Sequence, residues 1–415
     1  MRTAIVARSP STALLADGYD VGMEPWVEAA RRDTPGVENV VHFNNAGAAL
    51  PPQVVVDTVV GHVRREAEIG GYEAAAEAAE RLEGLYVSIA TLVGASPEEI
   101  AVVENATRAW DMAVYGFPFR PGDRVITARA EYASNVIALL QLQRRHGIEI
   151  VLIDDDDEHG QISLDHLASE LAAGAALVAL THAPTNGGLI NPAAAVGALC
   201  RDHEVFFVLD ACQSVGQLPI DVTAIGCDVL SATSRKYLRG PRGCGFLFVG
   251  RRALERLEPP FLDLHAAIWT GDGTYEVRPD ARRFENWESN YAAKLGLAAA
   301  IDYALDVGIE TTWPRIQALA DALRNGLATL EGVEVHDKGA IRGGIVTFTV
   351  NGRSAEEIKA GLSRAGVNTH VSLPEYARYD QPHRGLPALV RASVHYYNTE
   401  TEIDQLLDAL RALGA

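Results

Sequence analysis

The stretch EVFFVLDACQ, residues 204–213, decides the fold because its apolar residues run without interruption up to the carboxylate of Asp210. A strand with one wet face alternates apolar and polar residues, whereas a strand that is apolar on both faces is typical of a parallel sheet buried between helices. Similar runs recur at 100–105, 124–129, 148–154, 176–183, 227–233 and 244–250, separated by amphipathic stretches such as 106–117, 134–147 and 191–203. This alternation predicts an α/β fold with a mostly parallel sheet and a ligand at the carboxyl ends of its strands.

The chain of 415 residues is long enough for one large and one smaller domain. We predict a large domain over residues 36–288 and a smaller α+β domain formed by residues 1–35 and 289–415. The pattern changes near residue 290, after which helical stretches at 291–308 and 401–415 surround strands at 343–350 and 389–397. Residues 1–22 are interpreted as an extension, since they lack the continuous apolar stretch of a secretory signal.

The composition argues against several classes of function. Lys and Arg number 36 against 55 Asp and Glu, a formal net charge of −19, which repels phosphate backbones and anionic lipid surfaces. We therefore expect no nucleic-acid and no membrane partner, and no apolar run approaches the roughly 20 residues of a membrane span. The four cysteines show no CxxC spacing, which favours a reducing, cytoplasmic location. The 12 histidines show no metal-ligand spacing, so no metal site is expected.

A strong local signal for chemistry is SATSRKYLRGPRGCGFLFV, residues 231–249. A strand ends in small hydroxyl residues, presents Lys236 and passes through a glycine-rich turn into the next strand. A lysine held there is a candidate Schiff-base amine, because restricted solvation and the positive charge of Arg235, Arg239 and Arg242 lower its pKa. A basic surface turn is the alternative interpretation.

Asp210 strengthens the assignment of Lys236. It ends an apolar strand 26 residues before the lysine (236 − 210 = 26), which is one strand–helix–strand step. A carboxylate in this position can pair with a pyridinium nitrogen and keep it protonated, which makes pyridoxal 5′-phosphate (PLP) an electron sink. An aspartate that only caps a helix is the alternative.

With these motifs the chain resembles the class V aminotransferase family of fold-type I PLP enzymes. This group includes cysteine desulfurases, isopenicillin N epimerase-like proteins and the C–S lyases of ergothioneine assembly. The resemblance runs from FNNAGAALP at 43–51 to VRASVHYYNTETEID at 390–404, and LDACQ together with SRK-x-L-x-GPRG carries most of it. It implies a PLP enzyme that works as a homodimer on an amino-acid substrate.

The resemblance assigns a cofactor site residue by residue. Lys236 would form the Schiff base with PLP, Asp210 would bind the pyridine nitrogen and Gln213 would reach the phenolic oxygen. The other implied contacts are Ala106, Thr107, Arg108, Tyr132, Thr185, Thr233 and Arg235. Residues 106–108 begin a helix, where free N–H groups and the helix dipole can hold a phosphate, although Thr107 could also be a plain N-cap. Tyr132 stands where desulfurases place a histidine, and it can stack on the ring but cannot shuttle protons near neutral pH.

The resemblance also implies a substrate side. Arg391, in VRASVHYY, matches the arginine that binds the α-carboxylate, a role suited to a planar bidentate donor. Asn44 and Asn45 match the loop that lines the substrate, and His370 lies in a segment that could contact it. The alternatives are a surface ion pair for Arg391, turn chemistry for the asparagines and a solvated loop position for His370.

Two departures from the desulfurase pattern shape the functional prediction. Thr185 stands where desulfurases usually carry asparagine, and the segment that matches their catalytic loop, GVNTHVSLPEYARYD at 366–380, contains no cysteine. Without a thiolate the loop has no persulfide acceptor, which argues against a desulfurase.

The stretch at 62–80 and SRKYLRGPRG look most similar to hercynylcysteine sulfoxide lyase-like proteins. We therefore predict a PLP-dependent C–S β-lyase that splits a cysteine S-conjugate, a thioether or sulfoxide, into pyruvate, ammonia and a sulfur species. The resemblance places it in actinobacterial secondary metabolism of the ergothioneine or lincosamide type. Decarboxylative deamination and epimerisation are alternatives, because substrate orientation decides which bond breaks. A non-catalytic binding protein would require the loss of Lys236 or Asp210, and both are present.

Overall fold

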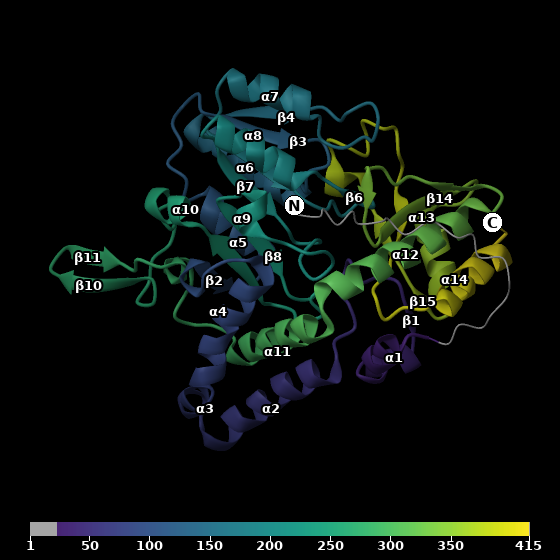
Figure 1. Ribbon diagram of the computed structural model, residues 1–415, viewed down its shortest axis with the longest axis horizontal. Helices are drawn as coiled ribbons and strands as arrows, with labels where there is room; N and C mark the ends of the chain where they lie inside the picture. The colour runs from purple at the N-terminus through teal and green to yellow at the C-terminus, as the bar shows by residue number, and fades with distance from the viewer. Residues whose placement is uncertain (1–22, 415) are drawn as a thin grey trace, which may run out of the picture.

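The computed structural model describes residues 23–414, so the extension predicted for residues 1–22 lies outside the described residues. The largest sheet is 7-stranded, in the order β2 (Ile100–Val103), β9 (Gly245–Val249), β8 (Val229–Thr233), β7 (Phe206–Asp210), β5 (Leu177–Thr181), β3 (Arg124–Ala128) and β4 (Glu149–Ile153) (Figure 1). Neighbouring strands are parallel from β8 to β4, whereas β9 is antiparallel to both of its neighbours. The predicted α/β fold with a mostly parallel sheet is confirmed.

Helices cover both faces of this sheet, as its unbroken apolar strands require. Along β7, Phe207 and Leu209 pack in one apolar core while Phe206 and Val208 pack in the other, because successive side chains of a strand point to opposite faces. The first core includes α4 (Ala79–Val93), α7 (Leu164–Ala172), α8 (Ala193–Asp202), α9 (Val222–Ile225) and α11 (Tyr291–Val307). The second includes α5 (Ala106–Val114), α6 (Ala133–His146) and α10 (Arg251–Arg256).

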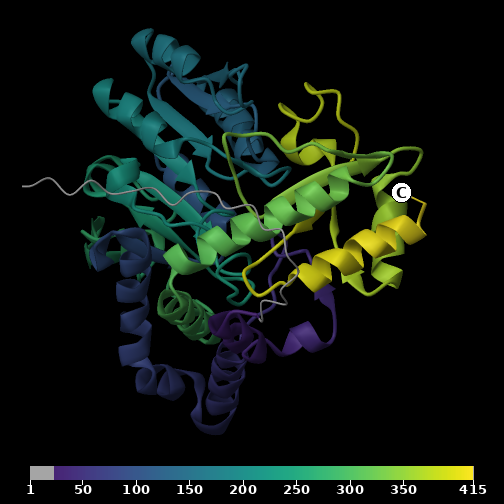
Figure 2. The same ribbon diagram turned by 45° about the vertical axis from the view of Figure 1, so that its right-hand side comes forward.

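A smaller antiparallel sheet has its own core. Its order is β12 (Val333–Val335), β14 (Ile345–Val350), β17 (Leu389–Ser393) and β16 (His370–Ser372), and it packs with α1 (Pro25–Arg32), α12 (Ile309–Ala328), α13 (Ala355–Arg364) and α14 (Glu400–Ala412). Figure 2 shows α12 passing from the end of α11 towards this second sheet. The domain boundary predicted at residue 288 falls just before α11, whose Leu297 and Ile301 belong to the core of the large sheet.

Short strand pairs connect segments that are distant in sequence. β1 (Val41–His42) pairs with β15 (Val367–Asn368), and β6 (Leu189–Ile190) pairs with β13 (Ile341–Arg342). Single 3-10 turns lie at Pro35–Glu38, Pro97–Glu99, Ala281–Phe284 and Pro374–Ala377. These pairs join the segment after β5 and the chain near residue 42 to the segments that precede β14 and β16 of the smaller sheet.

Two features stand away from the sheets. α2 (Gln53–Ile69) and α3 (Gly71–Glu77) extend beside α4 and α11, and a hairpin of β10 (Ala267–Gly271) and β11 (Thr274–Val277) projects from the large domain (Figure 1). The exposed fraction is 65% for Ile268, 74% for Trp269 and 56% for Tyr275. In residues 23–414, no helix has the length and apolar character needed to cross a membrane.

Candidate active site

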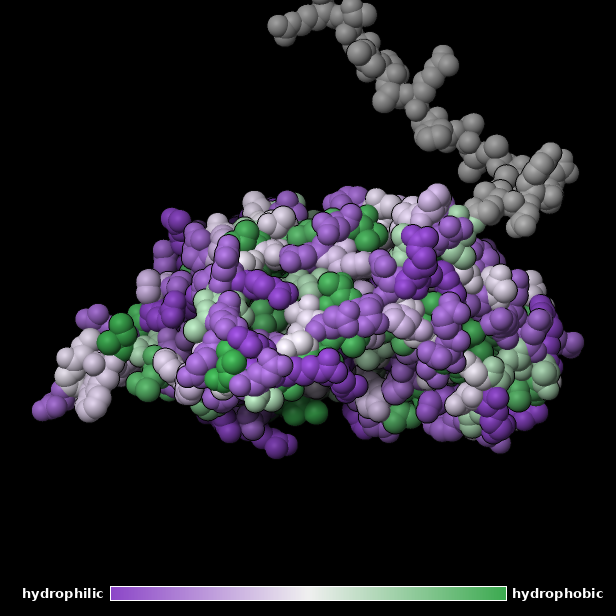
Figure 3. Space-filling model, turned by 90° about the horizontal axis from the view of Figure 1, so that it is seen from below, coloured by the Kyte–Doolittle hydropathy of each residue, from purple (hydrophilic) through white to green (hydrophobic). Residues whose placement is uncertain are grey.

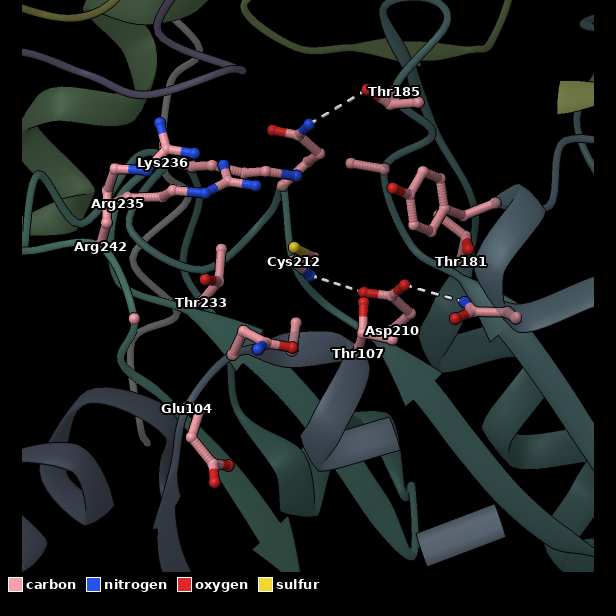
Figure 4. Close-up of a pocket in the computed structure, with 17 residues that line it drawn as sticks. Glu104, Thr107, Thr181, Thr185, Asp210, Cys212, Thr233, Arg235, Lys236 and Arg242 are labelled. Carbon is pink, nitrogen blue, oxygen red and sulfur yellow. Dashed lines mark hydrogen bonds between the residues drawn. The ribbon is translucent and has the colours of Figure 1, made fainter. Parts of the chain in front are cut away.

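A pocket of about 280 Å³ opens where strands of the large sheet end (Figure 4). Thr181, Asp210 and Thr233 are the last residues of β5, β7 and β8, which are neighbours in the sheet, and all three line the pocket. Because parallel strands present their carboxyl ends at one edge, the fold itself sets the spacing of these side chains. The start of α5 and the turn that carries Lys236 complete the walls.

The turn after β8 is tightly held. The Ser234 hydroxyl donates to the backbone carbonyl of Cys244 at 2.8 Å and also bonds that of Pro241. Arg239 has a positive φ of 60° and is 2% exposed; its guanidinium donates to the carbonyl of Leu50 at 2.9 Å and to the Tyr396 hydroxyl at 2.7 Å. This arginine is therefore buried between the segment before α2 and the segment after β17, and the turn is not the basic surface feature considered as an alternative.

Lys236 lines the pocket together with Cys212. Burial lowers the pKa of Lys236, and the positive charge of Arg235 lowers it further, against the opposing effect of Cys212. Because a neutral amine is the form that attacks an aldehyde, this environment favours Schiff-base chemistry. Burial also raises the pKa of the Cys212 thiol, which keeps the sulfur protonated near neutral pH.

Asp210 faces the same pocket and is 5% exposed. Its Oδ2 accepts a hydrogen bond from Nδ2 of Asn135 at 2.9 Å, and its Oδ1 accepts one from the backbone N–H of Cys212 at 2.9 Å (Figure 4). Burial raises the pKa of Asp210, while these two bonds oppose the rise. A cation placed against this carboxylate would relieve its desolvation, and the protonated nitrogen of a pyridine ring has the required charge.

Another part of the pocket wall suits an anion. Ala106 and Thr107 lie in the first turn of α5, where backbone N–H groups lack carbonyl partners within the helix, while Asn105 caps the helix by accepting from the N–H of Arg108 at 2.9 Å. Thr233 and Arg235 also line the pocket, and Arg235 bonds the carbonyl of Gly47. The guanidinium of Arg108 instead lies 4.8 Å from the ring centroid of Phe261, so only its backbone belongs to this helix start.

Buried polar atoms that lack a hydrogen-bond partner indicate whether the pocket fits PLP. Gln213 lines the pocket, and its buried Oε1 has no hydrogen-bond partner within residues 23–414, while Nε2 donates to the carbonyl of Ala46 at 3.1 Å and to Thr185 Oγ1 at 3.4 Å. The site therefore offers an amine for an aldehyde, a carboxylate for a cationic ring nitrogen, helix N–H groups for a phosphate and a free amide oxygen between them. These residues fit PLP.

The predicted substrate side comes from the smaller sheet. Arg391 on β17 is 5% exposed, and its Nη1 donates to the carbonyl of Thr185 at 3.2 Å and to its hydroxyl at 2.5 Å. Its Nη2 reaches Asn44 Oδ1 at 3.4 Å, and its buried Nε has no partner among the described residues. Burial lowers the pKa of Arg391 to about 10, with a contribution from the positive charge of Arg235. A buried cation with an unused donor is a suitable partner for a carboxylate.

His370 on β16 pairs directly with Arg391 across the strands. Burial, and then the positive charge of Arg391, lower the pKa of His370 to about 4, so the imidazole is neutral near pH 7. Tyr132, which precedes α6 as its N-cap residue, lines the pocket as expected from the sequence.

Asn45 is placed differently from the prediction. It is 0% exposed, and its Nδ2 donates to the carbonyls of His42 and Ser393 at 3.1 and 2.7 Å and to Asn398 Oδ1 at 3.2 Å. Its Oδ1 accepts from the hydroxyl of Tyr397. The carboxamide is thus used to hold the segment after β1 against the chain that follows β17, and only Asn44 reaches Arg391.

Sequence reasoning missed several residues that line the pocket: Glu104, Asn105, Asn135, Thr181, Ala183, Cys212, Arg242 and Gly243. Two of them could have been found. Asn135 lies about one helical turn after Tyr132 in AEYASN, on the same face of the helix, and Cys212 lies two residues after Asp210, on the same side of the chain. Within residues 23–414, no cluster of metal-ligating side chains is present.

The fold and this pocket define a PLP-dependent enzyme with lyase-type activity. The chain belongs to the Aminotransferase class-V family, whose model matches residues 40–406. It is 27% identical over 395 residues to a probable cysteine desulfurase of Methanothermobacter thermautotrophicus, covering 93% of this chain and 98% of the relative. It is 31% identical over 419 residues to probable cysteine desulfurase 2 of Mycobacterium leprae, covering 93% and 96%. The apo structure of cysteine desulfurase from Thermococcus onnurineus NA1 superimposes with a TM-score of 0.86 at 26% identity, over 94% of this chain and 98% of that chain.

These relatives correct the functional prediction. The prediction of a C–S β-lyase for a cysteine S-conjugate in secondary metabolism, and the argument against a desulfurase, are wrong, because the relatives that match more than nine-tenths of the chain are named as cysteine desulfurases. The two alternatives, decarboxylative deamination and epimerisation, fit no better. A single loop can lose its cysteine while the rest of a site persists, so the loop at 366–380 does not outweigh a resemblance over the whole chain.

Proposed function

We propose that this protein removes the sulfur atom of L-cysteine with PLP as cofactor. In the balanced reaction, L-cysteine and a thiol give L-alanine and the persulfide of that thiol. The observation that carries the proposal is the placement of the Lys236 amine and the Asp210 carboxylate in one pocket, with the buried guanidinium of Arg391 bonded to Thr185 of its wall. Named relatives of this chain support cysteine as the amino acid.

Each residue then has a definite task. When bound, PLP supplies a ring that withdraws electrons from the α-carbon of the substrate. Lys236 would hold the cofactor and would accept the α-proton of the substrate at Nζ, since burial lowers the pKa of this amine and so favours its neutral form. Asp210 keeps the ring nitrogen protonated, and Arg391 orients the substrate carboxylate.

The acceptor thiol is proposed to come from a separate molecule. The segment 366–380 contains no cysteine, and Cys200, Cys227 and Cys244 are buried elsewhere in the fold. Cys212 lines the pocket, but burial raises its pKa and so disfavours the nucleophilic thiolate. A small diffusible thiol reaches a site of this size without needing a loop residue.

We also propose a homodimer that works in the cytoplasm. The projecting hairpin places Ile268, Trp269 and Tyr275 in solvent, and Figure 3 shows hydrophobic residues on the hairpin where it leaves the body. Large exposed apolar groups of this kind mark interaction surfaces, and the family resemblance implies a second copy of the chain as the partner. All four cysteines are free, which supports a reducing compartment. Sedimentation analysis should give twice the mass of one chain; a single-chain mass would contradict the dimer.

Product analysis tests the proposed reaction. The PLP-loaded protein is incubated with L-cysteine and dithiothreitol, and alanine, sulfide, pyruvate and ammonia are quantified. Alanine and sulfide in equal amounts are expected, because dithiothreitol releases the transferred sulfur as sulfide. Pyruvate and ammonia without alanine would overturn the proposal, since they report elimination of the sulfur group. The Lys236→Ala variant serves as the control for uncatalysed breakdown.

A further inference from the structure

Glu131 is a buried carboxylate that the proposed chemistry has not used. It lies between β3 and α6 and is 2% exposed. Its Oε1 accepts from the N–H of Tyr132 at 2.8 Å and from Nδ2 of Asn135 at 2.9 Å, and its Oε2 accepts from the N–H of Thr181 at 3.1 Å and from Thr127 Oγ1 at 3.1 Å. The Thr181 hydroxyl also bonds Oε1. Backbone N–H groups can only donate, so this environment is arranged for a carboxylate and not for a carboxylic acid.

Asn135 connects Glu131 to Asp210. Its Nδ2 donates to Glu131 Oε1 and to Asp210 Oδ2, each at 2.9 Å. The two hydrogens of one amide nitrogen are therefore both used, one for each carboxylate. A flipped amide would turn its oxygen towards two acidic groups, so the orientation of Asn135 is fixed by its neighbours.

The consequence for Asp210 is that both of its oxygens have fixed donors. Asn135 holds Oδ2, and the N–H of Cys212 holds Oδ1. The plane of the carboxylate is thereby set before any ligand arrives. A second negative charge then stands behind Asn135, in a buried region where charges interact more strongly than in water.

We propose that Glu131 is a positioning residue that acts through Asn135 on Asp210, fixing its carboxylate and adding negative charge so that the ring nitrogen of bound PLP stays protonated. This inference rests on the part of the proposed function in which Asp210 pairs with the ring nitrogen. Glu131 itself contacts neither cofactor nor substrate in this arrangement. The inference extends the proposed function, because it identifies a residue that helps to keep the ring nitrogen of PLP protonated.

The electrostatic surroundings agree with this role. Burial raises the pKa of Glu131 to about 7, the hydrogen bond from Thr181 opposes the rise, and the negative charge of Asp210 adds to it. The titratable groups that act on Asp210 from its other side include Lys236, whose charge lowers its pKa. The measurements are therefore made at pH 8, above this value, where the carboxylate form of Glu131 is favoured.

The test reads the ring nitrogen directly, without substrate. The protein is loaded with PLP carrying ¹⁵N in the ring, and the ¹⁵N chemical shift distinguishes a protonated from a neutral nitrogen. At pH 8 the parent should show the protonated shift. Glu131→Gln and Asn135→Ala should each move the protonation equilibrium towards the neutral form by about tenfold, equivalent to about one pKa unit.

A matched control separates positioning from folding. Thr127→Val removes a hydrogen bond to Oε2 of Glu131 with little change in shape and leaves Asn135 untouched. This variant should keep the protonated ¹⁵N shift, even if it lowers the melting temperature. The double variant Glu131→Gln/Asn135→Ala should show no larger shift than the stronger single variant, because the two residues act as one unit.

An unchanged ¹⁵N shift in Glu131→Gln, in protein that folds and binds PLP, overturns the inference. If Glu131→Gln does not fold, Asn135→Ala decides the question by the same measurement. An equal shift in Thr127→Val would also overturn it, because the effect would then follow general disturbance of this region. The ¹⁵N measurement contains no substrate. Its result therefore does not depend on whether the protein desulfurates cysteine, and a failure of the proposed function can be told apart from a failure of this inference.

Discussion

The two sides of the pocket are built in different ways. On the cofactor side, Thr181, Asp210 and Thr233 end three adjacent strands, so one buried sheet determines their separation. On the proposed substrate side, Arg391 comes from the smaller sheet, is paired with His370 of the neighbouring strand, and bonds Thr185 of the pocket wall. The first side depends on one rigid element, whereas the second depends on how two domains meet.

This difference indicates how the enzyme divides its work. Groups that govern bond breaking need accurate placement, which a sheet buried on both faces provides. Residues that select the substrate can differ from one enzyme to another, together with the smaller sheet that carries them, while the cofactor-binding residues stay the same. We therefore expect substitutions on the cofactor side to abolish turnover and those on the substrate side to change binding more than chemistry.

Replacing Lys236 should have the largest effect. Lys236→Ala removes the amine proposed to hold the cofactor and to accept the α-proton, so turnover should fall by about 10²–10⁴-fold or more. The visible absorbance of the bound cofactor, measured after gel filtration, should disappear with it. Lys359→Ala, at an exposed position on α13, is the control and should keep both signals. Parental turnover by Lys236→Ala would refute the assignment of the site.

Asp210→Ala should cause the second-largest loss of turnover. The variant keeps the helix start of α5 and Thr233 for the phosphate, so it should still bind PLP, but a neutral pyridine ring withdraws electrons poorly. We expect kcat to fall by about 10²–10³-fold, the loss typical of a removed electrostatic stabiliser. Steady-state kinetics with saturating PLP measure this. A decrease smaller than tenfold would show that the ring nitrogen does not depend on Asp210.

Arg391→Lys should affect the substrate side. The ammonium keeps the charge but cannot make the bidentate fork, nor bond the carbonyl and hydroxyl of Thr185 together. KM for cysteine should rise by about tenfold or more, with a smaller decrease in kcat, whereas PLP binding should remain. Kinetics that match the parent would move the carboxylate site to another residue, and Arg384 would be examined next.

The difference between the cofactor side and the substrate side also explains which features could be predicted from the sequence. The large-sheet strands were found because each is a continuous apolar run, and Lys236 and Asp210 were found because strand ends meet at one edge of a parallel sheet. Both inferences need only local patterns and one rule of topology.

The substrate side could not be predicted in the same way. Asn45 has the residue type and position of a binding group, yet its hydrogen bonds go to residues 42, 393, 397 and 398, most of which are distant in sequence. The role of Glu131 was not visible in the sequence, because Thr181, which bonds it, and Asp210, which it reaches only through Asn135, lie on other strands. The absence of cysteine from the loop at 366–380 led to a wrong functional prediction. A cysteine missing from one segment does not exclude an acceptor thiol that comes from a separate molecule.

Lys338→Met should weaken the junction between the domains. The Lys338 amine bonds Asp155 of the large domain and Asp380 at the end of the 366–380 segment, the latter at 2.6 Å, and Asn186 donates to Asp380 at 2.7 Å. Without the amine, the carboxylates of Asp155 and Asp380 lose this shared cation, and Asp380 keeps only Arg384, at 3.5 Å. KM for cysteine should rise about threefold to tenfold, with kcat within about twofold. Limited proteolysis should also cut the 366–380 segment faster. An unchanged KM would mean that this ion-paired junction does not position the substrate side.

The smallest effect is expected for His370→Gln. His370 adjoins Arg391, and a histidine at this place could be taken for an acid–base group of the reaction. Burial and the positive charge of Arg391 lower the pKa of His370 to about 4, so between pH 5 and 8 the imidazole stays neutral and does not change its charge. Glutamine keeps a neutral polar side chain there. The pH profile of kcat/KM should therefore have the same acidic limb in the variant as in the parent, with the plateau within about threefold. A shift of that limb in His370→Gln would show that His370 titrates in this range, and it would place acid–base chemistry on the substrate side of the pocket.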